Sequence, residues 1–192
     1  NKSAIIDIGS NDGTFLNFFN RSNELIGIDP SLNKFKKFYN KNIFKIDNFF
    51  SKKNIKKKIR KDKKFDLITS FAMFYDIDDP NSFCKDINDL LKDNGIWVVE
   101  FSYLPLLLKN LTYDQICHEH VTYYSLGVFK NLIEKNGLKI LDFNLNEING
   151  GSIQIICSKK TSKFKANLQR ISKNLKSEKK IRFREFNKFN NR

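Results

Sequence analysis

The stretch Asp7-Ile8-Gly9-Ser10-Asn11-Asp12-Gly13-Thr14 decides the fold of this chain. It overlaps the apolar run 4–8, which is typical of a buried parallel strand, and it leads into residues 14–19, which have the character of a helix start. Gly9 and Gly13 permit a tight turn and let a ligand approach the backbone closely. Free N–H groups at the start of a helix can bind an anionic group. The stretch therefore predicts a strand, a glycine turn and a helix, with a ligand site at the turn.

A second apolar run, 24–29, closes with Asp29 and ends at Pro30, about 20 residues after Gly9. An acidic residue at this point is placed to accept hydrogen bonds from ribose hydroxyls. Taken singly, the glycines could form an ordinary turn and Asp29 could cap a helix before Pro30, but the joint pattern favours a nucleoside site. The glycine spacing G-x-x-x-G lacks the third glycine of the G-x-G-x-x-G turn, which argues against a nicotinamide oxidoreductase.

Short apolar runs alternate with segments of helical spacing along the chain. The predicted strands are 4–8, 24–29, 43–46, 65–70, 96–99, 138–143 and 152–157, and the predicted helices are 14–19, 32–38, 80–91 and 125–137. Ser125 is the expected cap of the last helix, and Asn94-Gly95 is predicted as a turn before the fifth strand. This alternation predicts an α/β fold with a mostly parallel, seven-stranded sheet.

The alternation of predicted strands and helices ends after residue 158. From Thr161 the chain is basic, and Phe164, Leu168, Ile171 and Leu175 have amphipathic helical spacing. We therefore expect a domain over residues 1–158 and a basic amphipathic helix over 159–192 that leads toward a further C-terminal domain. The first residue is not Met and a strand pattern begins at once, so we expect the chain to be a piece of a longer protein.

The chain is strongly basic: 35 Lys and Arg against 21 Asp and Glu give a net charge of +14 over 192 residues. We interpret this excess mainly as a compositional habit spread over the surface, and residues 52–64 as a solvated helix and loop. The alternative is a nucleic-acid-binding module, which would show a clustered positive face. Residues 52–64 contain no aromatic side chain that could stack on bases, which argues against this alternative.

The three cysteines, Cys84, Cys117 and Cys157, lie far apart and form no C-x-x-C pair. This pattern argues against a disulfide scaffold or a zinc knuckle and fits a reducing compartment, so we expect a cytoplasmic protein. No apolar run reaches the roughly 18 residues that a bilayer-spanning helix needs, and no signal peptide begins the chain. We therefore expect neither a membrane partner nor a nucleic-acid partner.

Both histidines of the chain flank Glu119 in the segment Cys117-His118-Glu119-His120. If this segment is extended, His118 and His120 point to one side and Glu119 points to the other. Imidazole and carboxylate groups can take up or release protons near neutral pH. Metal binding is disfavoured because a third ligand at helical spacing is missing, and plain structural packing stays an alternative. We interpret Cys117 as a small packed residue.

Two groups of motifs resemble a known family. The stretch 7–13 together with Gly27-Ile28-Asp29-Pro30-Ser31 resembles motif I and its acidic partner in class I S-adenosylmethionine (SAM)-dependent methyltransferases. The more specific segments 113–120, 123–126 and 149–152 resemble the sugar C-methyltransferase group, whose members are associated with branched deoxysugars carried on nucleoside diphosphates. The resemblance covers residues 5–31, 66–79 and 94–157 and implies a Rossmann-like fold.

The resemblance implies SAM as the methyl donor and a set of residues that bind it. These residues are Asp7, Gly9, Asn11, Asp12, Gly13, Asp29, Pro30, Asp47, Phe71 and Met73. Asp47 would lie near the adenine, and Phe49 or Phe50 would pack against that ring. Phe71 and Met73 follow the fourth strand at the carboxyl edge of the sheet, where α/β proteins bind ligands. The alternatives are an exposed turn for Asp47 and core packing for Phe71.

The resemblance also implies a catalytic site for methylation at carbon. A carbon next to a ketone must lose a proton before it can attack the methyl group. By resemblance His120 corresponds to the base and Glu119 is its neighbour, while His118 is either a further site residue or structural. The implied acceptor is a small molecule, a nucleotide-linked keto-deoxysugar. No metal is expected in this chain, and the family's N-terminal zinc-binding segment and C-terminal domain are expected to lie outside it.

Two positions depart from the sugar enzymes. Cys117 stands where a Tyr is common, and Asp76 stands where a His is often found. The acceptor therefore stays open. Methylation of another small molecule at oxygen or nitrogen is one alternative, and a domain that binds the donor without catalysis is another. The sequence leaves the oligomeric state open.

Overall fold

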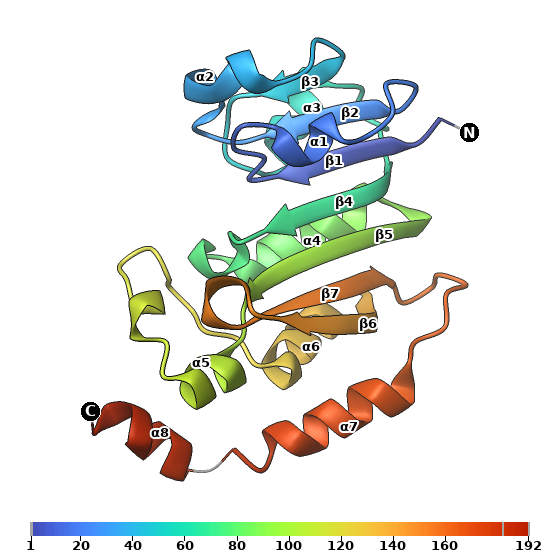
Figure 1. The fold of residues 1–192 in the computed structure, drawn as a ribbon. Coiled ribbons are helices and arrows are strands. Elements are labelled where there is room, and N and C mark those ends of the chain that lie inside the picture. Colours follow the sequence, from blue (N-terminus) through green and yellow to red (C-terminus); the bar gives the residue numbers. More distant parts are fainter. Residues whose placement is uncertain (1, 182, 192) are drawn as a thin grey trace.

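The structure is a computed structural model that describes residues 2–181 and 183–191, without the side chains of residues 183–186. The described residues form one seven-stranded sheet in the order β3-β2-β1-β4-β5-β7-β6 (Figure 1). The strands are β1 (Ala4–Ile8), β2 (Glu24–Ile28), β3 (Ile43–Ile46), β4 (Phe65–Phe71), β5 (Leu91–Ser102), β6 (Leu138–Asn146) and β7 (Ser152–Lys159). Neighbouring strands from β3 to β5 run parallel, and only β7 runs antiparallel to its neighbours β5 and β6. The predicted α/β fold with a mostly parallel sheet is confirmed.

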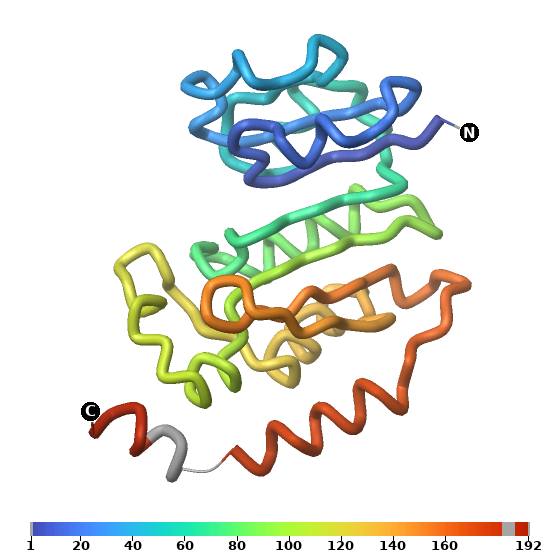
Figure 2. Tube along the Cα trace, in the orientation of Figure 1, coloured from blue at the N-terminus to red at the C-terminus, as the bar shows by residue number. Residues whose placement is uncertain are grey.

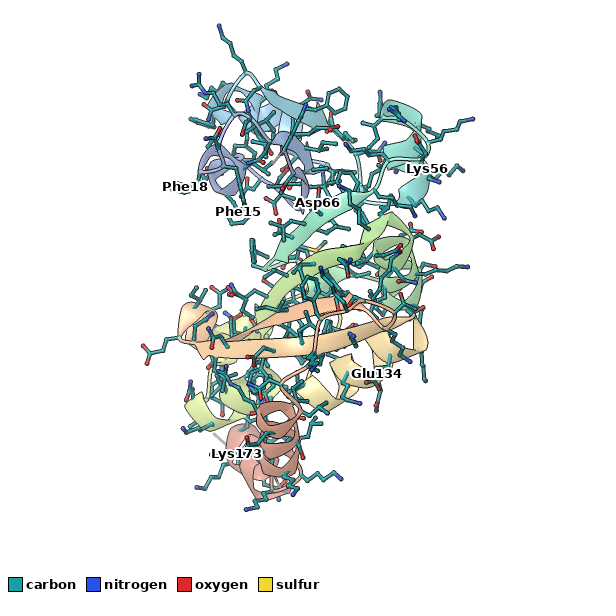
Figure 3. The ribbon with its side chains drawn as sticks, turned by 90° about the vertical axis from the view of Figure 1, so that its right-hand side faces the viewer. Phe15, Phe18, Lys56, Asp66, Glu134 and Lys173 are labelled. Carbon is teal, nitrogen blue, oxygen red and sulfur yellow. The ribbon has the colours of Figure 1, made fainter. Side chains whose placement is uncertain are left out.

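Helices cover the two faces of the sheet unequally. The α-helices are α1 (Thr14–Asn17), α2 (Leu32–Phe35), α3 (Lys52–Lys58), α4 (Pro80–Leu90), α5 (Leu104–Asn110), α6 (Leu126–Lys135), α7 (Leu168–Glu178) and α8 (Phe183–Asn190), and the 3-10 helices are η1 (Lys36–Phe38), η2 (Phe74–Asp76), η3 (Tyr113–Gln115) and η4 (Ile148–Gly150). Buried residues of α3, α4 and α6 share one large core, whereas α1 and α2 close a smaller core over β1, β2 and β3. Figure 3 shows Phe15 and Phe18 on the α1 side of the sheet, with Lys56 and Glu134 on the opposite side.

The large core is centred on aromatic side chains between the sheet and α4 and α6. Trp97 of β5 is fully buried, and its indole N–H donates a hydrogen bond of 2.9 Å to the hydroxyl oxygen of Ser70. The ring of Phe74 in η2 lies 5.8 Å from the Trp97 ring and 5.3 Å from the Phe129 ring. This packing fixes η2 at the carboxyl end of β4, which matters for the site described below.

Most predicted elements are present at the expected residues because their local signals are strong. The side chain of Ser125 accepts a hydrogen bond from the N–H of Val128 at the start of α6, as predicted for a cap. Asp79 caps α4 in the same way, and Pro80 is its first helical residue. The predicted helix over 32–38 is α2 continued by η1.

The fifth strand begins earlier than predicted. β5 starts at Leu91 and so includes Asn94-Gly95, which the sequence predicted as a turn. Its pairing with β4 loses register after the Phe65–Leu91 pair. A Cβ at Gly95 would lie 2.7 Å from the carbonyl oxygen of Phe65. The glycine therefore permits a close backbone approach within an irregular strand, and the prediction of a separate turn is wrong.

Residues 160–181 leave β7 and run as a strap beside the β6 edge of the sheet (Figure 2). The predicted single basic helix is in fact two helices, α7 and α8. Ile171 of α7 is buried and Leu175 packs against the large core, so the predicted apolar stripe covers this domain's own surface. Helix α8 packs on α5, where Phe189 meets Leu107 and Leu108.

Candidate active site

A cavity of about 300 Å³ lies at the carboxyl edge of the sheet, where the loops after β1, β2, β3 and β4 meet. Parallel strands bring their carboxyl ends to one edge, and α/β proteins bind ligands there. The cavity is lined by Ile8, Gly9, Ile28, Asp29, Pro30, Ser31, Phe49, Phe50, Met73, Asp76 and Ile77. Its size is at the lower end of the range for small-molecule sites, which begins at about 300 Å³.

The glycine turn forms one wall of the cavity, and its shape requires both glycines. Gly9 has φ 70° and Gly13 has φ 77°, a region that side chains rarely enter. A Cβ at Gly13 would lie 2.5 Å from the ring of Tyr39. The Tyr39 hydroxyl in turn donates to the carbonyl oxygen of Asn11 at 2.9 Å and lies 2.8 Å from the Ser10 hydroxyl. Tyr39 therefore holds the turn from below, a role that no sequence signal indicated.

Asp29 joins the glycine turn to the loop after β2. Its Oδ2 accepts a hydrogen bond of 3.0 Å from the N–H of Asn11, and its Oδ1 accepts bonds from the N–H and hydroxyl of Ser31 at 2.7 and 2.5 Å. The carboxylate is buried and lines the cavity. A carboxylate offers about four lone-pair sites, so these three bonds leave room for one ligand hydroxyl.

Asp7 lies beneath the site and does not line the cavity. Its Oδ1 accepts a hydrogen bond of 2.6 Å from the hydroxyl of Thr69 on β4. Burial raises the pKa of Asp7 to about 7, and the nearby charge of Asp29 acts in the same direction. Asp7 therefore supports the site from outside the cavity, and its buried surroundings disfavour the charged form of its carboxyl group.

The other predicted donor residues fall into two groups. Gly9, Asp29, Pro30 and Met73 line the cavity, whereas Asn11, Asp12, Gly13, Asp47 and Phe71 do not. Asp12 instead accepts a hydrogen bond of 3.0 Å from the N–H of Thr14, which lowers the pKa of Asp12. Helix α1, which follows, has only four residues, so its dipole can contribute little to anion binding.

Asp47 and Phe71 have partners elsewhere. Asp47 is exposed, and its Oδ2 accepts a hydrogen bond from the side-chain amide of Asn33. Phe71 packs edge to face against Phe15 of α1, with ring centroids 5.0 Å apart. The structure therefore does not bring these two residues to the cavity. It does bring Phe49 there, with a ring that is 73% exposed.

Asp76 is the cavity residue that the sequence reasoning left out of the site. It ends η2, and none of the described residues donates a hydrogen bond to its side chain. Burial raises the pKa of Asp76, the charge of His120 lowers it, and Glu119 raises it. The sequence carried one signal that Asp76 belongs to the site: it follows β4 at the carboxyl edge of a parallel sheet, where ligands bind.

The loop that carries His120 docks on η2. The rings of His120 and Tyr75 lie 4.0 Å apart, and the N–H of Thr122 donates a hydrogen bond of 3.2 Å to the carbonyl oxygen of Tyr75. Within the part of the chain that the structure describes, the buried Nδ1 of His120 has no hydrogen-bond partner. Because Asp76 follows Tyr75, the loop and the cavity meet at this short helix.

The segment His118-Glu119-His120 is not extended, so the condition under which its two imidazoles would point to one side is not met. The chain turns there, with the N–H of His120 bonded at 3.3 Å to the carbonyl oxygen of Cys117. His118 and Glu119 lie exposed in the turn, and only His120 packs inward. Hydrogen bonds from its own backbone N–H and from Cys117 lower the pKa of Glu119. Cys117 is exposed, so its interpretation as a packed residue is wrong.

The Gly150-Gly151 turn does not approach the cavity. A Cβ at Gly150 would lie 2.1 Å from Cγ2 of Thr112, and one at Gly151 would lie 2.6 Å from Cβ of Leu106. The side-chain amide of Asn110 donates a hydrogen bond of 2.8 Å to the carbonyl oxygen of Gly150. These glycines therefore let the β6–β7 connection pack against α5 and the chain that follows it.

In the part of the chain that the structure describes, no group of three or more His, Cys, Asp or Glu side chains is arranged to hold a metal ion. No helix in the same residues is long and apolar enough to cross a membrane.

Fold and site together define a class of protein. The family model described as "Methyltransferase domain" matches residues 1–142, and the chain belongs to this family. It is a Rossmann-like, SAM-dependent methyltransferase domain.

One curated relative is the C-methyltransferase NovU of Streptomyces niveus, which is 29% identical over 155 residues. The match covers 80% of this chain and 37% of NovU, so the chain spans little more than a third of that relative's length. The LepI complex with SAM aligns with a TM-score of 0.64 and 12% identity, over 83% of this chain and 43% of LepI. The plantazolicin methyltransferase BpumL, solved with a pentazolic desmethylPZN analogue and S-adenosylhomocysteine (SAH), aligns with a TM-score of 0.62 and 14% identity, over 82% of this chain and 76% of BpumL. Both structures show the shared fold.

Proposed function

We propose that this domain transfers a methyl group from SAM to a carbon atom of a small molecule, a nucleotide-linked keto-deoxysugar. The observation that carries the proposal is the meeting of two features at η2. Tyr75 contacts His120, and the next residue, Asp76, lines the cavity that also contains Asp29. The similarity to a C-methyltransferase supports methylation at carbon.

The cavity fits an adenosyl donor in three respects. Asp29 keeps one lone-pair site for a ribose hydroxyl after its three internal bonds. Phe49 presents an exposed ring on which an adenine can stack. Gly9 leaves its backbone open to a close ligand. When bound, SAM supplies an electrophilic methyl group on a positively charged sulfur.

His120 is the proposed base. Its buried Nδ1 lacks a partner among the described residues, a state that costs free energy unless a bound group supplies the hydrogen bond. A carbon next to the ketone gives its proton to His120, and the electron pair of that C–H bond forms an enolate. The enolate carbon then bonds to the methyl group while the methyl–sulfur bond breaks and its electron pair stays on sulfur. For this displacement the acceptor carbon must lie in line with the methyl–sulfur bond, and His120 is proposed to hold the acceptor in that position.

Asp76 is the proposed electrostatic partner of His120. Asp76 follows Tyr75, whose ring lies 4.0 Å from that of His120, and the charge of His120 lowers the pKa of Asp76 while burial raises it. The proposed role of Asp76 is to offset positive charge that develops beside it during the reaction. Glu119 is exposed in the same turn and adds a weaker negative charge. This assignment gives Asp76 and Glu119 assisting roles.

Hydrogen exchange in a keto-sugar tests the proposal. We expect the domain to exchange the hydrogen next to the ketone of a nucleoside-diphosphate keto-deoxysugar in D₂O, measured by NMR. His120→Ala should slow this exchange by at least about 100-fold and leave SAH affinity unchanged, because general base catalysis contributes a factor of this size. His118→Ala is the matched control, since the His118 side chain is exposed in the same turn. Undiminished exchange in His120→Ala would show that His120 is not the base.

Methylation at oxygen or nitrogen is the competing outcome of the same experiment. A methylated product that keeps the hydrogen next to the ketone and carries the new methyl group on oxygen or nitrogen would establish it. We further propose that segments outside this chain complete the acceptor side, which the 37% coverage of NovU supports. We also place the protein in the cytoplasm, where the three unpaired cysteines would remain reduced.

A further inference from the structure

The positive charge of the chain is concentrated in one segment. Residues 159–192 hold 13 of the 35 Lys and Arg but only 2 of the 21 Asp and Glu, a net charge of +11. The preceding 158 residues hold 22 cations against 19 anions, a net charge of +3. The expectation that the charge is spread over the surface is therefore wrong.

The inner face of α7 is fully used in packing. Ile171 is buried and Leu175 packs against the large core. The carboxylate of Glu178 accepts hydrogen bonds from the N–H groups of Leu126 and Gly127, at 2.6 and 2.9 Å, at the start of α6. One of the two acidic residues of the segment is thus directed inward, where it caps another helix.

The outer face of α7 and of the turn after it is a row of lysines. Helical geometry places Lys173, Lys176 and Lys180 opposite Ile171 and Leu175. Figure 3 shows Lys173 on α7, at the end of the molecule far from Phe15. We define the lysine row as Lys173, Lys176, Lys179 and Lys180, which are all exposed. Among the described residues, none of these four ammonium groups forms an ion pair with a carboxylate.

We propose that the lysine row binds this domain to an anionic lipid surface. The row lies on a strap beside the β6 edge (Figure 2), and its four lysines are exposed, so an anionic surface can approach them. Clusters of four or more basic residues on an amphipathic helix attract anionic headgroups. Because Ile171 and Leu175 are already packed on the domain, the binding is mainly electrostatic and weakens with salt. Leu168 of the same stripe is 72% exposed at the first turn of α7 and is available to enter the interface.

Two features favour a lipid surface over a nucleic acid. Helix α7 contains no aromatic residue, so it has no ring on which a base could stack. The one Arg of α7, Arg170, donates hydrogen bonds to Asp142 and Asn144 of β6, so its guanidinium is not free to read a guanine edge through paired hydrogen bonds. This proposal goes beyond the proposed function, and it does not depend on it.

The donor cavity stays open in this arrangement. The lysine row lies beyond β6, at one end of the sheet order, whereas the cavity is lined from the ends of β1, β2 and β4. Membrane contact through the row therefore leaves the donor site accessible. The expected consequence is a domain held at a bilayer surface and able to exchange SAM with solution.

Vesicle co-sedimentation with two matched variants tests the proposal. The test variant changes Lys173, Lys176, Lys179 and Lys180 to Gln, and the control variant changes the exposed Lys34, Lys36, Lys37 and Lys41 near the β3 edge to Gln. Both variants lose four charges. With vesicles of one-third phosphatidylglycerol in phosphatidylcholine, we expect binding to fall about fivefold per lysine removed in the test variant and little in the control. Circular dichroism of each variant verifies its fold.

Three results would overturn the proposal. The first is no binding of the wild-type chain to anionic vesicles at physiological salt. The second is an equal loss in both variants, which would mean that net charge alone drives the binding. The third is an RNA or duplex DNA oligonucleotide that binds through the same lysines while vesicles do not, which would make the row a nucleic-acid surface.

Discussion

The donor side of the site and the loop that carries His120 are built in opposite ways. On the donor side, the glycine turn, Asp29 and Asp7 are tied together by internal hydrogen bonds, and the carboxylates are buried. In the His120 loop, Ile116 and Val121 are 55% and 56% exposed, and a buried imidazole nitrogen has no partner among the described residues. The glycine-turn side of the cavity is thus held by contacts within this domain, whereas the His120 loop keeps exposed apolar side chains and a buried nitrogen without a partner among the described residues.

The largest expected effect concerns the buried carboxyl under the donor side. Burial raises the pKa of Asp7 from 3.8 to about 7, so Asp7 contributes stability below pH 4 that is lost as pH rises through 7. Asp7→Asn removes this pH dependence. The free energy of unfolding of the variant, minus that of wild type, should therefore be higher at pH 8 than at pH 4, by at most on the order of 4 kcal/mol. Urea denaturation at both pH values measures this difference.

Asp78→Asn is the control for that experiment, because Asp78 is exposed. It should change stability equally at pH 4 and pH 8. If Asp7→Asn also shows no difference between the two pH values, the carboxyl is not held in a raised-pKa state.

The next effect concerns the glycine turn. Gly13→Ala puts a Cβ 2.5 Å from the Tyr39 ring at φ 77°, so we expect the free energy of unfolding to fall by about 3 kcal/mol. Gly127→Ala is the matched change in α6, where the nearest atom is a carboxylate oxygen of Glu178 at 3.2 Å. It should stay within about 1 kcal/mol of wild type. Equal losses in chemical denaturation would refute the account of the turn.

A third comparison separates two acidic residues that the sequence assigned to the donor. Asp29→Ala should weaken SAH binding by at least about thirtyfold, because it removes a buried carboxylate with three internal hydrogen bonds. Asp47→Ala should change it less than about threefold, since an exposed residue outside the cavity makes no contact there. Isothermal titration calorimetry measures both. A larger loss in Asp47→Ala would restore the sequence-based assignment near the adenine.

The smallest effect concerns the His120 loop itself. Ile116→Ser and Val121→Thr should change the free energy of unfolding by no more than about 0.5 kcal/mol, because both side chains are exposed. The same variants should weaken acceptor binding more than donor binding if the loop belongs to the acceptor side. Chemical denaturation tests the first statement, and titrations with SAH and with a nucleoside-diphosphate keto-deoxysugar test the second. A large loss of stability would mean that the loop is packed.

Local patterns predicted the sheet and the donor turn well because their physics is local. Apolar runs become buried strands, and the caps at Ser125 and Asp79 act on N–H groups three residues away. The support of the turn by Tyr39 and the contact of Tyr75 with His120 join residues far apart in sequence, so no periodicity could reveal them. The turn at His118 is local, closed by the N–H of His120 on the carbonyl oxygen of Cys117, but its residues carry no glycine or proline that marks a turn.

The most direct test of the central claim is a crystal structure of this chain with SAH. The account predicts the ribose hydroxyls at Asp29, the adenine beside Phe49, and the sulfur at the end of the cavity formed by Asp76 and nearest to His120. The methyl donor and the proposed base would then lie on either side of one acceptor atom. SAH bound outside this cavity, or bound in it with its sulfur directed away from η2, would contradict the account.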